Sequence, residues 1–121
     1  MNYESLTVVE SRVAPGVTFT IAKMSYGRRL ELMRQIRELA RRMEFVEASP
    51  EPGGKMDAAL LDAEIGRLYV KWGLRSVSGL ILDGAEATPD QLAECGPEDV
   101  FREALAAVQV QSGITEAERK N

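Results

Sequence analysis

The most regular apolar spacing in the chain runs from Tyr26 to about Glu47. At 100° per residue, seven apolar side chains of this segment fall within one arc of about 140°. They are Leu32, Met33, Ile36, Leu39, Ala40, Met43 and Val46. Ser25 stands where an N-cap residue would accept a hydrogen bond from the first helical turn. The sequence therefore predicts a long amphipathic helix whose apolar face must be covered by other parts of the chain.

The opposite face of this helix is charged. Three arginines occupy a narrow arc there: Arg34, Arg37 and Arg41. Glu31 and Glu38 lie beside them, and we expect Glu38 to form i,i+4 ion pairs with Arg34 and Arg42. The pattern fits a solvated ion-pair face, a phosphate-binding stripe or a surface for an acidic protein partner.

The net charge of the helix helps to choose among these three possibilities. From Arg28 to Glu47 there are six arginines and four glutamates, a net charge of +2 in a chain whose total is −4. That small excess argues against nucleic acid as the main partner. Leu30 and Phe45 interrupt the polar face, so they could anchor a protein partner or contact the N-terminal strands.

The first 24 residues contain two β-branched runs, Leu6–Val9 and Val17–Ile21, separated by the turn signal Ala14-Pro15-Gly16. We expect two strands that form a hairpin. In the second run apolar and hydroxyl side chains alternate, which predicts one buried face and one solvated face.

Prolines and glycines gather between Ala48 and Lys55, and we expect a flexible connector over about 48–56. A second helix is predicted from Asp57 to about Leu74, with two apolar stripes and with Trp72 in the core. The main stripe consists of Leu61, Ile65, Leu68, Tyr69 and Trp72. The second stripe consists of Ala59, Leu60, Ala63, Val70 and Leu74. Such a helix is central in its fold or lies in an oligomer interface, so the second stripe could mediate self-association.

The last third alternates strand and helix signals. A strand is predicted over 77–82, with the tight turn Asp83-Gly84 and a short return strand over 85–87. Thr88-Pro89 begins a short helix to Glu94. Gly96-Pro97 restarts a helix that ends near Gln111, at Ser112-Gly113. Residues 115–118 repeat the spacing of a capping box.

The composition narrows the function classes. The 121 residues include no histidine and one cysteine, Cys95, so zinc fingers, histidine-based catalysis and an intrachain disulfide are excluded. We expect one α+β domain over 1–121, with no enzymatic activity, metal or cofactor. No apolar run reaches the roughly 18 residues of a membrane span, and no leader is recognised, so a cytoplasmic location is expected.

The region from Trp72 onward carries a recognisable pattern: Trp72-Gly73-Leu74, then 79–84 ending in Asp-Gly, then Thr88-Pro89 with Leu92. It resembles the tail assembly chaperones of long-tailed bacteriophages. In that family a helix ends near a Trp, a short strand closes on an Asp-Gly turn, and a Pro-initiated helix leads into a longer one. The tail over 115–121 is also similar, and the resemblance covers about residues 70–121.

The resemblance implies a non-enzymatic protein that coats the helical tape measure protein in the host cytoplasm and recruits tail tube subunits. It gives no residue-level site. From the helical faces, we select as protein-binding candidates Leu30, Arg34, Arg37, Arg41, Phe45, Leu60, Val70 and Leu74. Two alternatives stay open: a structural head-tail connector or tail-completion protein, and a small nucleic-acid-binding regulator that uses the Arg-rich helix.

Overall fold

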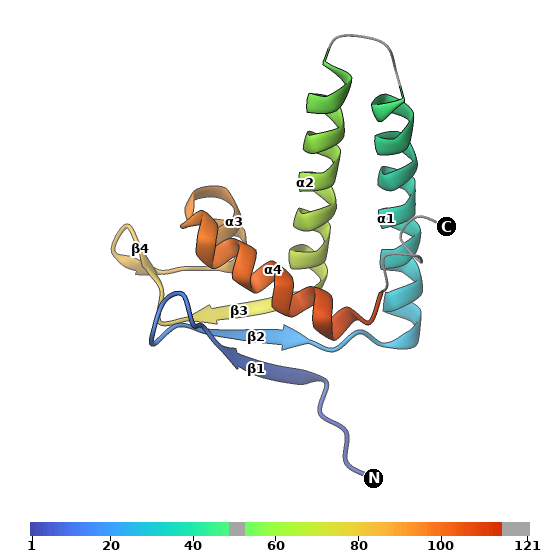
Figure 1. Cartoon of the computed structure of the whole chain (residues 1–121). Coiled ribbons are helices and arrows are strands. Elements are labelled where there is room, and N and C mark those ends of the chain that lie inside the picture. The colour runs from blue at the N-terminus through green and yellow to red at the C-terminus, as the bar shows by residue number, and fades with distance from the viewer. Residues whose placement is uncertain (49–52, 115–121) are drawn as a thin grey trace.

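The structure is a computed structural model that describes residues 1–48 and 53–114, and its fold is α+β, as the sequence predicts (Figure 1). The elements in chain order are β1 (Leu6–Glu10), β2 (Thr18–Ala22), α1 (Tyr26–Glu47), α2 (Gly54–Gly73), β3 (Leu74–Ser78), β4 (Ile81–Leu82), β5 (Ala85–Glu86), α3 (Pro89–Cys95) and α4 (Glu98–Ser112).

A three-stranded antiparallel sheet in the order β1-β2-β3 forms the base of the fold. The predicted β1–β2 hairpin is confirmed. Phe19 and Ile21 of the central strand are fully buried, whereas Thr18 and Thr20 face the partly exposed side. The predicted alternation is therefore confirmed as well, because side chains along a strand point to opposite faces.

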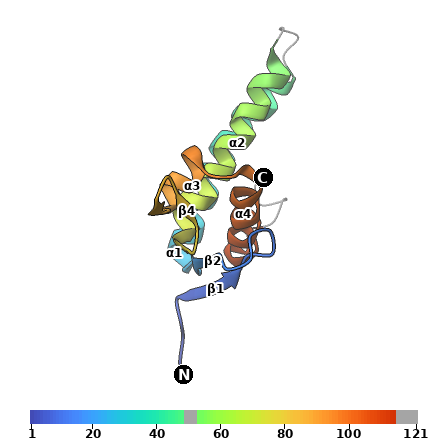
Figure 2. The same ribbon diagram turned by 90° about the vertical axis from the view of Figure 1, so that its left-hand side faces the viewer.

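The helices all lie on the buried side of this sheet. In Figures 1 and 2, α4 lies across the sheet, and α1 and α2 rise from it side by side as an antiparallel pair. The core forms where the lower parts of α1 and α2 meet β2 and α4. Its largest fully buried side chains are Phe19, Ile21, Leu32, Ile36, Ile65, Tyr69, Leu92 and Val108. Burying each of them contributes about 1.5–3 kcal/mol.

Helix α1 has the predicted bounds and the predicted cap. The Ser25 hydroxyl accepts a hydrogen bond from the Arg28 N–H at 3.3 Å. Leu32, Ile36 and Ala40 of the predicted apolar arc are buried. The other members of the arc, Met33, Leu39, Met43 and Val46, are half-buried.

The connector prediction is corrected at its C-terminal end. Residues 49–52 lie outside the described residues, but Gly54 to Met56 already belong to the first turn of α2. Gly53, at φ 91°, adopts the left-handed backbone that starts the helix. The burial of Ala58 one turn later and the contact of α2 with α1 favour this early start despite the low helix propensity of glycine.

The strand predicted over 77–82 is also corrected, because the structure divides this segment. Its first part belongs to β3, which pairs with β2, and its last part is β4, which pairs with β5. The break lies at Gly79, which has φ 84°. A Cβ there would lie 2.3 Å from the Gly16 carbonyl oxygen, so only glycine fits where the two turns touch.

The predicted turn and capping signals of the last third are confirmed. Asp83 and Gly84 both have positive φ, 49° and 86°, and join β4 to β5. Thr88 and Gln91 form a reciprocal capping box at the start of α3. Helix α4 ends at Ser112, and Gly113, at φ 69°, is its C-cap. The capping box predicted over 115–118 lies outside the described residues.

A carboxylate of α4 holds the turn between β1 and β2. One oxygen of Glu103 accepts a hydrogen bond from the Ser11 hydroxyl at 2.5 Å. The other accepts from the N–H groups of Arg12 at 2.7 Å and Val13 at 3.3 Å. Burial raises the pKa of Glu103, but these hydrogen bonds and the Arg12 charge outweigh it, and the pKa is lowered.

The contact between α2 and α4 generates a first prediction. A Cβ at Gly73 would lie 2.4 Å from Cγ1 of the buried Val108, whereas a Cβ at Gly27 would meet nothing within 4 Å. We expect Gly73→Ala to lower the free energy of unfolding by about 1–3 kcal/mol through overpacking. Gly27→Ala, the control, should be neutral or stabilising. Urea denaturation measures both, and equal effects would contradict this packing.

The hydrogen bonds to Glu103 generate a second prediction. A carboxyl whose pKa is lower in the folded state stabilises the fold above its unfolded pKa, and this contribution is lost as the pH falls through the lower folded value. We therefore expect Glu103→Gln to be destabilising at neutral pH, and we expect the difference from the parent protein to shrink as the pH falls through the acid range in which the folded carboxyl titrates. Thermal unfolding across pH measures the difference. A difference that stays constant throughout acid titration would refute the role of the carboxylate.

Candidate protein-binding site

Five candidate residues follow one another along α1 at spacings of four, three, four and four: Leu30, Arg34, Arg37, Arg41 and Phe45. We call them the α1 stripe. Residues at this spacing lie on one side of a helix. The apolar members at its two ends are exposed, Leu30 at 41% and Phe45 at 79%. A hollow of about 220 Å³ is lined by Leu30, Met33, Arg34, Arg37, Glu38 and Arg41, so the structure brings the first four members together.

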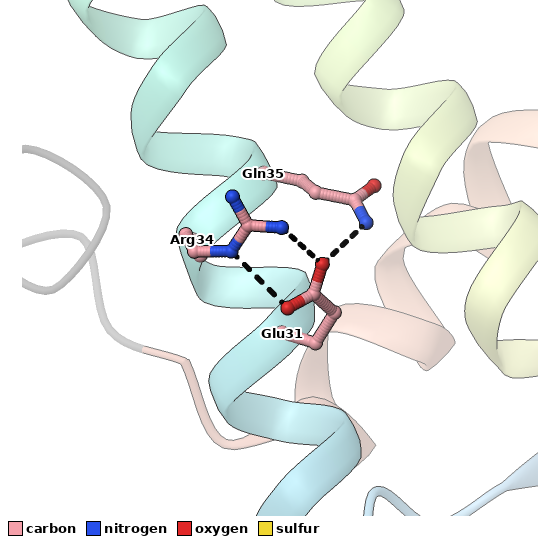
Figure 3. A network of polar contacts seen from close by, with 3 residues as sticks. All are labelled: Glu31, Arg34 and Gln35. Carbon is pink, nitrogen blue, oxygen red and sulfur yellow. Dashed lines mark hydrogen bonds and ion pairs between the residues drawn. The ribbon is translucent and has the colours of Figure 1, made fainter.

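Arg34 is held by its own helix. Its guanidinium donates two hydrogen bonds to the Glu31 carboxylate, at 2.5 and 3.1 Å, and Gln35 donates a third at 3.1 Å (Figure 3). These bonds lower the pKa of Glu31 and raise that of Arg34. Arg34 therefore pairs with Glu31 instead of the predicted Glu38. Because its charge is matched locally, Arg34 attracts anions less than an unpaired arginine would.

The next two arginines differ from Arg34. Arg37 is half-buried, and its Nε is buried without a hydrogen-bond partner among the residues that the structure describes. Arg41 is exposed and lines both the small hollow of the α1 stripe and a larger groove. No ion pair between Arg42 and Glu38, the second predicted partner, is found within 1–48 and 53–114.

The larger groove lies between the far halves of α1 and α2 and has a volume of about 510 Å³. Its lining residues define what we call the hairpin groove: Arg41, Arg42, Phe45 and Val46 of α1, and Asp57, Leu60, Leu61 and Glu64 of α2. Phe45 is 79% exposed and Leu60 is 60% exposed. Three candidate residues thus line one groove: Arg41 and Phe45 from α1, and Leu60 from α2.

Two candidates are wrong as surface residues. Val70 and Leu74 are only 3% and 5% exposed and belong to the hydrophobic core. The second stripe of α2 divides along its length. Its first half is exposed beside the free part of the helix pair, whereas its last part is buried where α2 meets the sheet and α4. A helical wheel cannot show this difference, because it projects the whole helix onto one circle.

Trp72 also differs from its predicted place in the core, because it is half-buried at the core's margin. The Arg28 guanidinium lies 4.6 Å from the centre of the Trp72 ring, and it donates a hydrogen bond to the Trp72 carbonyl at 2.9 Å. A cation over the indole face contributes about 0.5–1 kcal/mol at such partly exposed sites. Arg28 therefore covers part of the Trp72 ring at the margin of the core.

The sequence patterns did not predict two further hollows. One, of about 610 Å³, lies between α1, α2 and α3 and is bordered by the ion pair of Arg67 with Glu94. The other, of about 590 Å³, lies between α2, α3 and α4, and Phe101 and Leu105 line it. Residues of α2 and α3 line both hollows, so both depend on how α3 packs against α2. The apolar pattern of α4 was a sequence signal for the second hollow alone.

The chain matches no known family model, no curated protein and no solved structure. Among the described residues, no helix is long and apolar enough to cross a membrane. The same residues contain no cluster of three or more histidine, cysteine or acidic side chains that could hold a metal ion.

The different environments of two leucines generate a third prediction. Leu74→Ala should lower the free energy of unfolding by about 2–5 kcal/mol, because it leaves a cavity in the core. Leu60→Ala should change it by less than about 0.5 kcal/mol, because that side chain is exposed. Chemical denaturation of both variants tests the assignment. A large loss of stability for Leu60→Ala would show that this side chain is already covered.

Proposed function

We propose that the protein is a non-enzymatic assembly chaperone of a bacteriophage tail that binds the tape measure protein through the α1 stripe and the hairpin groove. The resemblance of residues 70–121 to the tail assembly chaperones suggests the family. The recruitment of tail tube subunits and the action in the host cytoplasm are parts of the same proposal.

The exposure of Phe45 and Leu60 in one groove carries this proposal. Exposed aromatic and aliphatic side chains that gather beside charged ones are typical of protein-binding surfaces. The groove lies at the far end of the helix pair, away from the core, so a partner can reach both helices without disturbing the sheet (Figure 1).

The groove suits a helical partner. An amphipathic helix can place apolar side chains against Phe45 and Leu60, while its polar side chains meet the charged rim. Arg41 and Arg42 favour carboxylates near one side of that helix. Leu30 offers a second apolar contact at the other end of the α1 stripe, 15 positions or about 22 Å from Phe45.

A chaperone must leave its client before the particle is complete, so its interface must be reversible. Small apolar contacts with exposed ion pairs meet this need, because exposed pairs contribute at most about 1 kcal/mol each. Binding would then depend on many copies along a long client, each of them exchangeable.

The test is co-expression of the tagged protein with the surrounding phage genes, followed by nuclease treatment and purification. We expect the tape measure protein to co-purify. The double variant Phe45→Glu with Leu60→Glu should reduce this recovery at least tenfold, because it places charges in the apolar part of the groove. Val110→Glu is the matched control, since Val110 on α4 is as exposed as Phe45, 78% against 79%.

The other outcomes separate the alternatives. Undiminished recovery with the double variant would refute the groove as the binding site. Retention of the protein in finished particles would favour a structural tail component. Loss of all partners after nuclease treatment would favour a nucleic-acid-binding regulator.

A further inference from the structure

The sheet ends in β1, which among residues 1–48 and 53–114 has a strand neighbour on one side only. β1 pairs with β2 over all five of its residues without a register shift. Figures 1 and 2 show β1 at the outer edge of the sheet. Natural edge strands are commonly blocked by a proline, a charged side chain or a bulge. β1 has no proline and no bulge, and its one charged residue, Glu10, is its last residue.

The register identifies which backbone groups are unpaired. Just before β1, the Ser5 carbonyl accepts from the Lys23 N–H at 2.8 Å, and just after it the Ser11 N–H donates to the Val17 carbonyl at 2.8 Å. Hydrogen bonding to β2 alternates along an antiparallel strand, so the odd-numbered residues point toward β2. Three residues therefore direct their N–H and C=O groups to the open edge: Leu6, Val8 and Glu10.

The side chains of the same residues are also exposed. They form the outer face of β1, where Leu6 is 44% and Val8 is 64% exposed. The neighbouring residues on this face of the sheet are Thr18, Thr20, Ala22, Ser76 and Ser78. Ala22 is buried, so β1 carries most of the exposed apolar surface of this face. An edge with unpaired backbone groups and apolar side chains is a template for another strand.

We propose that β1 pairs antiparallel with β1 of a second copy, about a twofold axis at Val8, and that the two sheets join into one of six strands. In this register Val8 lies opposite Val8 of the second copy, and Leu6 lies opposite Glu10. All six backbone groups that each strand directs to its edge are then hydrogen-bonded. An axis perpendicular to the sheet also keeps the apolar core of both copies on the same side.

Charge complementarity favours this register over its neighbours. It brings Glu4, two residues before β1, close to Arg12, two residues after β1 of the other copy, which gives two attractive pairs at the ends of the paired strands. A shift by two residues in one direction would oppose Glu4 to Glu10. A shift in the other direction would require the Arg12 N–H, which already donates to Glu103. The strand is short, so we expect an interface of less than about 1,200 Å² and a dissociation constant in the micromolar range.

The first test is site-directed crosslinking in the full chain with Cys95→Ser, since Cys95 is exposed. Cα atoms opposite each other in a hydrogen-bonded pair are about 5.5 Å apart, which a disulfide can span. Val8→Cys should therefore give a crosslinked dimer under mild oxidation. Glu10→Cys is the control, because it lies on the same face of the same strand but opposite Leu6. Equal crosslinking at both positions would overturn the register.

The second test uses charge exchange and sedimentation equilibrium. Glu4→Arg alone and Arg12→Glu alone create like-charge pairs, and each should weaken the dimer about tenfold. An equimolar mixture of the two variants has only opposite-charge pairs across the interface, so its affinity should recover. A parent protein that is monomeric at every concentration, or a dimer that none of these variants changes, would overturn the proposal. Neither test depends on the tape measure protein, so both are independent of the proposed function.

Discussion

The packing of the central strand β2 against the helices is the interaction on which the rest of the fold depends. Phe19 and Ile21 are fully buried, and they belong to one hydrophobic cluster with residues from α1, α2 and α4. Because this cluster fixes the lower parts of α1 and α2, their far halves can extend beyond it and support each other. The exposed hairpin groove is thus a consequence of where the core ends.

The local elements could be predicted because their signals are local. Ser25, Thr88 and Gly113 mark helix ends through hydrogen bonds or backbone conformations that a few neighbouring residues determine. The division of the 77–82 strand could not be predicted, because it depends on the contact between Gly79 and the distant Gly16. The early start of α2 depends in the same way on packing that local propensity does not include.

The candidate site was predicted in part for a related reason. The α1 stripe was visible because α1 presents one face to the core along much of its length, so its opposite face could be inferred. Val70 and Leu74 were misassigned because α2 changes its surroundings from the free helix pair to the core. The Glu31–Arg34 pair shows a further limit, because spacing allowed Arg34 two acidic partners and only side-chain geometry selected one.

The two proposed surfaces lie on different parts of the fold, and this separation has a mechanical consequence. The hairpin groove is formed by the far halves of α1 and α2, whereas the β1 edge belongs to the sheet from which they rise (Figure 1). A twofold axis perpendicular to the sheet would direct both helix pairs of a dimer to the same side. One extended helical client could then contact two grooves at once, and the second contact would form at a high effective concentration. Weak single interfaces would in this way give firm binding along the client and still allow each copy to leave.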